Sequence, residues 1–298
     1  MNQPSLEGRV AIVTGAGAGL GRAEALALAA AGARIVLNDL PGCADEAAAE
    51  VRALGVEAVV VPGDVGERAT ADAMLVAATE QLGGLDVVVN NAGITRDKML
   101  FNMTDEEFDL VVKVHLRGHF LLSRNAASFW RSRSKETGMP VDASVINTAS
   151  EAFLTGSPGQ PNYAAAKAGI TALTLSTARG LARVGVRANA ICPRARTAMT
   201  ADVFGADESG AAVDPYSPEH VAPLVVYLAS PASARISGQV FVVYGGMVAL
   251  LAAPVVEQRF DAAGDTWELA DLDSRLGSYF AERDPAICFA ADSVMKLL

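Results

Sequence analysis

A glycine-rich turn that joins an apolar run to an alanine-rich segment is the feature that most limits how this chain can fold. Arg9–Thr14 is short and rich in β-branched residues, and it leads into T-G-A-G-A-G-L-G, with glycines at positions 15, 19 and 21. Glu24–Ala31 then has the alanine and leucine composition of a helix. This order predicts a phosphate cradle, because glycines let a pyrophosphate approach backbone N–H groups at a helix start. On its own, such a cluster is equally typical of an ordinary turn.

Strand-like and helical segments then alternate along the chain. Further strands are predicted at Ala33–Leu37, Val56–Val61 and Leu85–Asn90, in a run through Val145 and Ile146 that ends at Ser150, and at Val186–Cys192 and Gln239–Val243. Helices are predicted at Asp45–Leu54, Arg68–Leu82 and Pro218–Ser230, and from a capping box at Thr104–Glu107 to about Trp130, followed by a polar loop at Arg131–Asp142. This alternation predicts a parallel sheet with helices on both faces.

Composition narrows the class of protein. The chain has 298 residues, of which 51% are hydrophobic, and this fits a well-buried α/β core. A formal net charge of −10 argues against sequence-independent binding of nucleic acid. The three cysteines are widely spaced, and we expect no secretory signal. The longest apolar stretch, Phe241–Val256, is interrupted by Gly245–Gly246 and Pro254 and is too short to span a membrane. We therefore expect a cytoplasmic protein with no nucleic-acid or membrane partner and no metal centre.

Three residues in the stretch Val145–Ile170 have the chemistry of a proton-transfer site. Tyr163 and Lys167 are four positions apart in an alanine-rich segment, so both project from one face of a helix. A nearby ammonium lowers the pKa of a tyrosine, and Ser150 at a strand end can bring a hydroxyl to the same carbonyl oxygen. Together they predict general acid–base catalysis at a C=O/CH–OH centre, although Y-x-x-x-K alone usually arises by chance.

Polar residues after other strands predict where a dinucleotide would lie. Asp39 comes eighteen positions after Gly21, close to the place for a carboxylate on the adenosine ribose hydroxyls. No Arg or Lys follows it directly to accept a 2′-phosphate, so NAD is favoured over NADP. Asp64, past the third strand, either reads an adenine edge or caps the next helix. Asn90–Gly93 ends the fourth strand at the carboxyl edge, where ligands of open α/β sheets bind.

These motifs, in this order and at this spacing, resemble those of the short-chain dehydrogenase/reductase family. The resemblance runs from about Leu6 to Gly246 and rests on T-G-x-x-x-G-x-G, N-N-A-G, Ser150 and Y-x-x-x-K. It implies a Rossmann-type, doubly wound parallel sheet of seven strands, with hydride transfer between a nicotinamide and an alcohol or carbonyl carbon. It assigns proton transfer to Tyr163, tuning of Tyr163 and ribose binding to Lys167, and polarisation of the substrate oxygen to Ser150. With the spacing arguments above, the expected cofactor-binding residues are Gly15, Gly19, Leu20, Gly21, Asp39, Asp64, Val65, Asn91, Ala92, Gly93, Tyr163, Lys167, Pro193 and Thr197.

A narrower resemblance bears on the substrate. N-N-A-G-I-T-R-D, V-H-L-R-G-H-F and P-R-A-R-T-A-M-T are similar to strings in the dehydrogenase unit of peroxisomal multifunctional β-oxidation enzymes and in bacterial hydroxysteroid dehydrogenases. That group uses NAD on (3R)-3-hydroxyacyl-CoA thioesters and on sterol hydroxyls. It shares His115, where the wider family has a catalytic asparagine that holds a relay water. The alternative for His115 is a packed ring with a satisfied hydrogen bond.

Two arginines follow the sixth strand. Arg194 stands where the wider family has a glycine, and Arg196 comes two positions later. Two guanidiniums on an acidic protein suit the phosphate of a CoA substrate, so both are candidate substrate residues beside Ser150 and Tyr163. The alternative is that they pair with carboxylates on a neighbouring helix.

The leading hypothesis is an NAD-dependent dehydrogenase that interconverts a secondary alcohol and a ketone on a 3-hydroxyacyl-CoA or steroid-type substrate. The alternatives are an NADPH-dependent 3-oxoacyl carrier-protein reductase and a non-catalytic NAD(H)-binding protein. We expect residues 1–250 to form the NAD-binding catalytic domain, and residues 251–298 to form an extension that packs near the active site or a subunit interface. The resemblance also implies a homodimer or homotetramer.

Overall fold

The computed structural model of the chain describes residues 5–200, 205 and 214–297. The chain divides into two compact units, Met1–Leu251 and Ala252–Leu298. Every candidate site residue named above lies in the first unit. Among the described residues, no helix is both long enough and apolar enough to cross a membrane.

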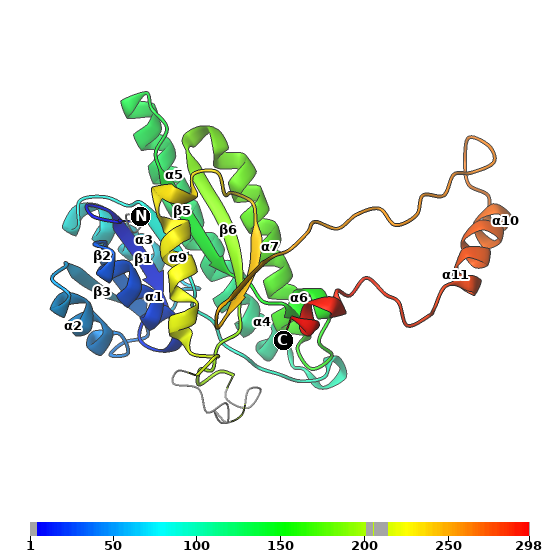
Figure 1. Cartoon of the computed structure of the whole chain (residues 1–298), viewed down its shortest axis with the longest axis horizontal. Helices are drawn as coiled ribbons and strands as arrows, with labels where there is room; N and C mark the ends of the chain where they lie inside the picture. Colours follow the sequence, from blue (N-terminus) through cyan, green and yellow to red (C-terminus); the bar gives the residue numbers. More distant parts are fainter. Residues whose placement is uncertain (1–4, 201–204, 206–213, 298) are drawn as a thin grey trace. The chain divides into compact units, whose positions relative to one another are not determined.

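The first unit is built on one eight-stranded sheet with the order β3-β2-β1-β4-β5-β6-β7-β8 (Figure 1). The strands are β1 (Val10–Thr14), β2 (Arg34–Asp39), β3 (Ala58–Pro62), β4 (Val87–Asn90), β5 (Ala143–Thr148), β6 (Val186–Pro193), β7 (Val240–Tyr244) and β8 (Met247–Leu250). β1 pairs in parallel with both β2 and β4, so the direction of winding reverses between β1 and β4. The carboxyl ends of the strands at such a reversal open a crevice, which is where open α/β sheets bind ligands.

Helices cover both faces of the sheet (Figure 1). Side chains of a strand alternate between the two faces, so Ala11 and Val13 of β1 join one apolar core while Val10 and Ile12 join the other. The helices that contribute to the first core are α1 (Gly19–Ala30), α2 (Asp45–Ala53) and α9 (Ala222–Ala229). Those that contribute to the second are α3 (Arg68–Val76), α5 (Gly118–Thr137) and α7 (Pro161–Leu181). The doubly wound α/β fold is therefore confirmed.

The helix predicted after Thr104 begins where expected and ends later. The capping box is confirmed: the Glu107 N–H donates to Thr104 Oγ1 at 3.3 Å, and the Thr104 N–H donates to the Glu107 carboxylate at 3.0 Å. Helix α4 (Asp105–Val112) passes through a π-helical turn, η3 (Lys113–Arg117), directly into α5. The helix stops at Gly138, whose φ of +69° favours glycine. The prediction of a loop from Arg131 was wrong, because polar residues there form the solvent-facing end of α5.

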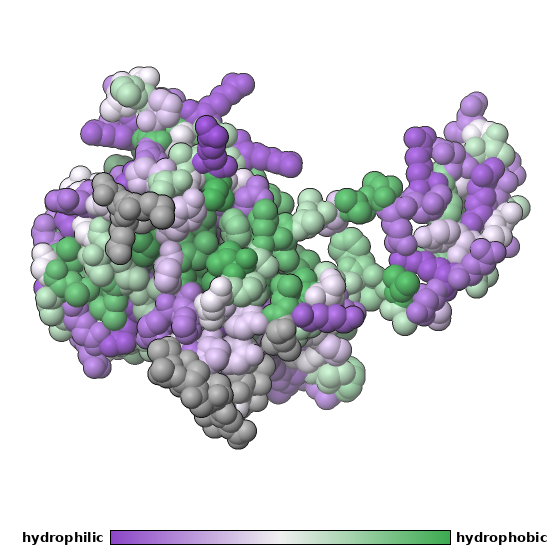
Figure 2. Space-filling view, viewed as in Figure 1, coloured by the Kyte–Doolittle hydropathy of each residue, from purple (hydrophilic) through white to green (hydrophobic). Residues whose placement is uncertain are grey.

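The sheet has one strand more than the seven predicted. Gly245, with a φ of +50°, and Gly246 form a two-residue turn, so β8 folds back antiparallel to β7 with Tyr244 opposite Met247. The sequence had indicated only that these glycines interrupt an apolar stretch. Val248 and Leu250 of β8 are 55% and 61% exposed, so this edge of the sheet presents apolar side chains to solvent. Figure 2 shows the hydrophobic residues of this face in green.

Shorter elements complete the chain. In the first unit they are η1 (Ala77–Gln81), η2 (Leu100–Asn102), α6 (Ala152–Thr155), η4 (Ala182–Val184), η5 (Pro218–His220) and η6 (Pro231–Ser233). The second unit contains α10 (Leu269–Leu272), η7 (Asp273–Gly277), α11 (Ser278–Glu282) and η8 (Asp292–Lys296).

Within the second unit, one tyrosine gathers most of the aromatic contacts. The Tyr279 ring lies edge-on to Phe260 and Phe280, with centroids 5.2 Å apart in both pairs. Its hydroxyl donates to Glu257 at 3.0 Å, and Glu257 also pairs with Arg283 at 2.8 Å. Three aromatic residues of this segment therefore contact one another: Tyr279 and Phe280 lie on α11, and Phe260 lies outside any helix.

Candidate active site

Tyr163 and Lys167 lie on the first two turns of α7, which opens with Pro161 at a position where its missing N–H costs nothing. Lys167 is only 2% exposed, and its Nζ lies 5.3 Å from the centroid of the Tyr163 ring. The ammonium donates a hydrogen bond of 2.5 Å to the carbonyl oxygen of Thr148, the last residue of β5. The structure thus brings the predicted tyrosine and lysine together at the carboxyl edge of the sheet.

Burial governs the protonation of this pair. Burial raises the pKa of Tyr163 to about 12, an effect that hydrogen bonding by Ser150 partly offsets. Burial also lowers the pKa of Lys167 to about 7. The sequence had led us to expect a tyrosine pKa lowered by the lysine. That expectation is overturned for the chain alone, because loss of hydration disfavours the phenolate more strongly than neighbouring groups favour it.

Ser150 lies two residues past the end of β5, just before α6. Its Oγ accepts a hydrogen bond of 3.2 Å from the Ala152 N–H, which orients the hydroxyl. Its hydrogen bonding to Tyr163 lowers the pKa of the tyrosine. The two hydroxyls therefore lie close enough to serve one substrate oxygen.

His115 is a buried, neutral ring held between Tyr163 and the end of β4. Its Nε2 lies 2.7 Å from the carbonyl oxygen of Ile94 and 3.0 Å from the Ile94 N–H, and its ring meets that of Tyr163 edge-on at 5.2 Å. Burial, helped by the positive charge of Lys167, lowers its pKa to about 3. Nδ1 has no hydrogen-bond partner among the described residues. A Cβ on Gly93 would lie 2.3 Å from His115 Cε1, so this glycine leaves room for the ring.

The glycine turn between β1 and α1 is as tight as a phosphate cradle requires. Gly15 and Gly19 have φ angles of +64° and +53°, in the region that favours glycine. A Cβ on Gly21 would lie 2.1 Å from the carbonyl oxygen of Gly15, so the start of α1 packs directly on the turn. The backbone at this helix N-terminus is therefore open to an anionic ligand.

Asp39 at the end of β2 faces this turn. Its Oδ2 accepts a hydrogen bond of 2.9 Å from the Gly17 N–H, and its Oδ1 accepts one of 2.8 Å from the Leu40 N–H. Sequence reasoning missed Gly17, although it is the middle glycine of the motif. A Cβ there would lie 2.3 Å from the Cys43 carbonyl oxygen and 2.9 Å from Asp39 Oδ2. Gly17 therefore lets the carboxylate approach the turn.

Asn91 and Ala92 join the ends of β4 and β1. The N–H groups of both donate to Thr14 Oγ1, at 3.0 and 3.1 Å, and the Asn91 side chain donates to the Thr14 carbonyl at 3.0 Å. Asn90 points the other way, into a buried polar network that includes Ser123 and Asn147. The N-N-A-G motif thus fixes the two strand ends that flank the crevice.

The carboxylate of Asp64 binds groups of the protein itself. Its Oδ1 accepts a hydrogen bond of 2.7 Å from the Gly66 N–H, and its Oδ2 pairs with Lys113 at 2.8 Å. These partners overcome the effect of burial and hold the pKa of Asp64 below its usual value. The carboxylate holds the turn before α3 but does not cap that helix, whose N-cap residue is Glu67. Asp64 also lines the cavity described below, so its role toward an adenine edge stays a prediction.

A cavity of about 540 Å³ at the carboxyl edge brings most of the candidate residues together. Those expected from the sequence that line it are Gly15, Gly19, Leu20, Asp39, Asp64, Val65, Asn91, Ala92, Gly93, His115, Tyr163, Lys167, Pro193 and Thr197. Lining residues that sequence reasoning missed include Ile94, Arg96, Leu110, Val114 and Met199. Ile94 and Arg96 belong to the N-N-A-G-I-T-R-D string, which was the available signal for them. Gly21, Ser150, Arg194 and Arg196 are not among the lining residues.

Arg194 and Arg196 do not line this cavity. Pro193, Ala195 and Thr197, which alternate with them along the chain, do line it. Arg194 binds Glu151 through two hydrogen bonds of 2.7 and 2.8 Å, and Arg196 pairs with Asp214 at 2.7 Å. Both arginines thus pair with carboxylates, as in the alternative, although Glu151 directly precedes α6 and Asp214 lies in a loop. Their assignment to the substrate stays a prediction.

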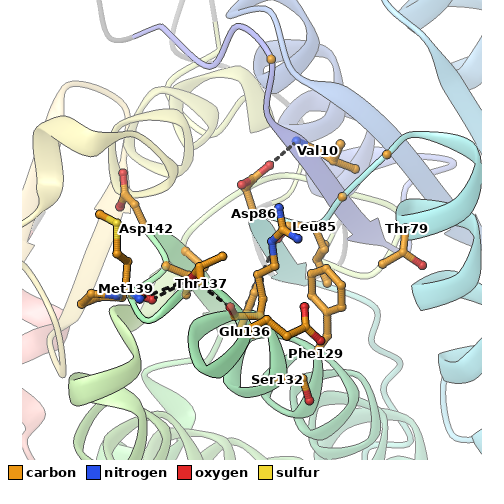
Figure 3. Close-up of a pocket in the computed structure, with 18 of the residues that line it drawn as sticks. Val10, Thr79, Leu85, Asp86, Phe129, Ser132, Glu136, Thr137, Met139 and Asp142 are labelled. Carbon is orange, nitrogen blue, oxygen red and sulfur yellow. Dashed lines mark hydrogen bonds between the residues drawn. The ribbon is translucent and has the colours of Figure 1, made fainter.

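A second cavity, of about 620 Å³, lies at the amino ends of β1, β4 and β5 (Figure 3). Its polar groups serve the fold: Asp86 accepts a hydrogen bond of 2.8 Å from the Val10 N–H, and Asp142 forms ion pairs with Arg9 and Arg187. It lies at the sheet edge opposite Tyr163. Nowhere in residues 5–200, 205 and 214–297 do three or more His, Cys, Asp or Glu side chains gather as a metal site.

Comparisons with known proteins agree with this geometry. The family model described as Enoyl-(Acyl carrier protein) reductase matches residues 15–248. Hydroxyacyl-CoA dehydrogenase ChsB1 of Mycobacterium tuberculosis (strain ATCC 25618 / H37Rv) is 57% identical over 304 residues, which cover 99% of this chain and 96% of that protein. The chain belongs to the short-chain dehydrogenase/reductase family. A crystal structure of a short chain dehydrogenase from Mycobacterium avium has a TM-score of 0.84 and 41% identity, and the match covers 96% of this chain and 99% of that chain.

This short-chain dehydrogenase/reductase is thus an oxidoreductase that acts on CH–OH groups, and its family binds a nicotinamide cofactor. Relatives differ in the carrier of the acyl group. A 3-oxoacyl-[acyl-carrier-protein] reductase of Synechocystis sp. (strain ATCC 27184 / PCC 6803 / Kazusa) is 38% identical over 252 residues, covering 82% of this chain and 98% of that protein. The predicted family is confirmed, whereas the cofactor and the carrier are matters for proposal.

Proposed function

We propose that this short-chain dehydrogenase/reductase uses NAD to interconvert the alcohol and ketone forms of a 3-hydroxyacyl-CoA, including substrates with a steroid-type acyl body. The observation that carries the proposal is that Tyr163 and Lys167, with Ser150 hydrogen-bonded to Tyr163, meet at a cavity that the glycine turn and Asp39 also line. The 57% identity to a hydroxyacyl-CoA dehydrogenase over nearly the whole chain supports the substrate class.

Asp39 is the reason to propose NAD over NADP. Its carboxylate lies at the glycine turn, within hydrogen-bond distance of the Gly17 N–H. A ribose 2′-hydroxyl can donate to such a carboxylate, whereas a 2′-phosphate would be repelled by it. The next residue is Leu40, which offers a phosphate no positive charge. Bound NAD⁺ would supply the acceptor for the hydride that leaves the carbinol carbon.

The chain's own residues would manage the proton. During oxidation, Tyr163 Oη takes the proton of the substrate hydroxyl as the carbon–oxygen double bond forms, and during reduction it returns a proton to the carbonyl oxygen. Ser150 donates a hydrogen bond to the same oxygen. Lys167, fixed by the Thr148 carbonyl, stabilises the phenolate when it carries its own proton.

His115 contributes as a neutral ring in this proposal. Its Nε2 is committed to Ile94, which leaves Nδ1 as a buried acceptor or donor beside Tyr163. Such a nitrogen can hold a water that passes protons between the Tyr163–Lys167 pair and solvent. The apolar lining residues Ile94, Leu110 and Val114 provide a wall for the acyl body.

The test is to measure NAD⁺ reduction with short-chain, long-chain and steroid-side-chain 3-hydroxyacyl-CoA substrates. The absorbance of the reduced cofactor monitors the reaction. We expect turnover with NAD⁺ and a preference in kcat/KM among the three thioesters. The competing hypothesis is that the protein reduces a 3-oxoacyl carrier protein with NADPH. This reaction should be measured as well, because the Synechocystis relative is a 3-oxoacyl-[acyl-carrier-protein] reductase. A higher kcat/KM in that assay would overturn the proposal. Absence of turnover in every assay, with NAD(H) still bound, would favour a non-catalytic protein.

A further inference from the structure

Arg96 is the only guanidinium among the described residues that line the cavity. The other charged or titratable lining residues lie elsewhere: Asp39 and Asp64 at the glycine turn and its neighbouring strand, and His115 and Lys167 buried beside Tyr163. Arg96 itself is exposed, so it stands at the solvent side of the cavity. Its position therefore suits an anionic group at the cavity mouth.

The backbone of Arg96 is tied to the catalytic helix. The side chain of Asn162 is fully buried and donates a hydrogen bond of 3.0 Å to the Arg96 carbonyl oxygen. The Oδ1 of the same asparagine accepts a hydrogen bond of 2.7 Å from the Tyr163 N–H. One side chain thus fixes Arg96 relative to the tyrosine at which the reaction occurs.

The guanidinium of Arg96 stays available, unlike the charges that follow it. Asp97 accepts a hydrogen bond of 2.6 Å from Gln160, and Lys98 pairs with Glu107 at 2.7 Å. Arg96 Nη1 donates to the carbonyl oxygen of Thr95 at 2.6 Å, and no carboxylate pairs with Arg96 within the part of the chain that the structure describes. A guanidinium has five N–H donors, so most of its capacity is left for a ligand.

We propose that Arg96 is an anion-binding subsite for the phosphate groups of a CoA thioester, an inference that rests on the proposed function. The phosphates of CoA lie at the end of a long arm, so an anion site for them belongs at the mouth of the cavity and away from the reacting carbon. A guanidinium binds phosphate oxygens through two parallel hydrogen bonds. Because this contact is equally strong in the ground state and the transition state, it lowers KM without raising kcat.

The test compares one 3-hydroxyacyl group on two carriers: CoA, and N-acetylcysteamine, which keeps the thioester but has no phosphate. Arg96→Gln should raise KM for the CoA ester by about tenfold, the effect of one lost charge-assisted hydrogen-bonded contact, and leave kcat nearly unchanged. Its KM for the N-acetylcysteamine ester should change less than about twofold on the same ground. The KM for the CoA ester should also rise with added salt in the wild type and much less in Arg96→Gln.

Two control variants sharpen the comparison. Arg131→Ala removes an exposed arginine on α5 that does not line the cavity, and it should leave both KM values unchanged. Arg196→Ala breaks the ion pair with Asp214, so it should affect both esters alike. A calorimetric Kd for NAD that rises in Arg96→Gln would assign the arginine to the cofactor and overturn the proposal. Equal losses on both esters in Arg96→Gln would also overturn it.

Failure of the proposed function gives a different result. If the wild type shows no preference for the CoA ester over the N-acetylcysteamine ester, the CoA substrate class is wrong. If the wild type prefers CoA and Arg96→Gln keeps that preference, only the Arg96 subsite is wrong.

Discussion

Tyr163 and Lys167 have lost most of their contact with water, and each shifts toward its neutral form. The pKa of Tyr163 rises to about 12 and that of Lys167 falls to about 7, both mainly through burial. A neutral phenol can give a proton to a carbonyl oxygen, whereas oxidation of an alcohol needs the phenolate. Oxidation of an alcohol by this pair therefore depends on groups that stabilise the Tyr163 phenolate during turnover.

Replacing either member of the pair should separate catalysis from binding. Tyr163→Phe should lower kcat by about 10³-fold, the usual range for loss of a general acid–base group, and leave the Kd for NAD nearly unchanged. Lys167→Ala should lower kcat and also raise the Kd for NAD, because in the proposed site the lysine binds the ribose as well as stabilising the phenolate of Tyr163. Steady-state kinetics and calorimetric titration measure both quantities. If Tyr163→Phe keeps most of its activity, the proton-transfer scheme is wrong.

Selection of the cofactor should depend on one carboxylate. Asp39→Ala combined with Leu40→Arg should reduce the preference for NAD⁺ over NADP⁺ by at least about tenfold in kcat/KM, because repulsion of the 2′-phosphate is replaced by attraction. Leu40→Arg alone serves as the control, since it keeps the carboxylate. Equal use of the two cofactors by the wild type would contradict the role of Asp39.

The close approach of Gly93 to His115 should be visible as an energetic coupling. Gly93→Ala places a methyl group where the ring lies, 2.3 Å from Cε1, and should lower the free energy of unfolding by about 1–3 kcal/mol. His115→Ala removes the ring, so the double variant should be more stable than the sum of the single effects predicts, by about 1 kcal/mol. Urea denaturation of all four proteins gives this cycle, and additive effects would argue against the contact.

At the scale of elements, α1 contains a group that the sequence did not single out. Glu24 is fully buried on this helix, and neither of its carboxylate oxygens has a hydrogen-bond partner among the described residues. Burial raises its pKa from 4.5 to about 8, so the carboxyl is largely protonated at neutral pH. Helix α1 begins at the glycine turn, so its stability bears on the cofactor site.

Glu24 should make the stability of the protein fall as the pH rises. Below pH 4.5 the group is mostly protonated in both the folded and the unfolded chain, so its ionisation does not affect the free energy of unfolding there. Between that pH and about 8, only the unfolded chain ionises, so the free energy of unfolding falls by at most about 1.4 kcal/mol per pH unit. Glu24→Gln should remove this slope. Urea denaturation at several pH values tests the prediction, and an unchanged slope in the variant would contradict it.

At the scale of the whole molecule, the second unit, Ala252–Leu298, bears on substrate choice. Among its described residues, 252–297, none belongs to either apolar core, and the aromatic contacts centre on Tyr279. We propose that this extension lies at the active-site mouth of its own subunit or of a partner, and shapes the pocket for a bulky acyl or sterol body. A homodimer or homotetramer, as the family resemblance implies, would allow the latter.

Truncation after Leu251 should show whether the extension has this role. The shortened protein should bind NAD normally and lose activity on a steroid-side-chain thioester far more than on a short-chain one. Calorimetric titration checks NAD binding, and size-exclusion chromatography with light scattering measures subunit number before and after truncation. Unchanged activity on every chain length would make the extension only a structural cover.

The local sequence determined the parts of this protein whose spacing has one physical meaning. Glycines between a β-branched run and an alanine-rich segment predicted a tight strand–helix turn, and Tyr163 and Lys167, four residues apart, share one face wherever their segment is helical. Strand–helix alternation likewise predicted the doubly wound sheet, and the capping box predicted where α4 begins. Each of these inferences depends on neighbours in the chain.

Only the tertiary structure decided features that depend on which segments meet in space. It turned Arg194 toward Glu151 and Arg196 toward Asp214, and it left Arg96 at the cavity, because the direction of a side chain in a loop depends on what packs beside it. It reversed the expected pKa of Tyr163, since burial is a property of the packed molecule. It also added β8, because a Gly-Gly turn becomes a hairpin only when an edge strand is available for pairing.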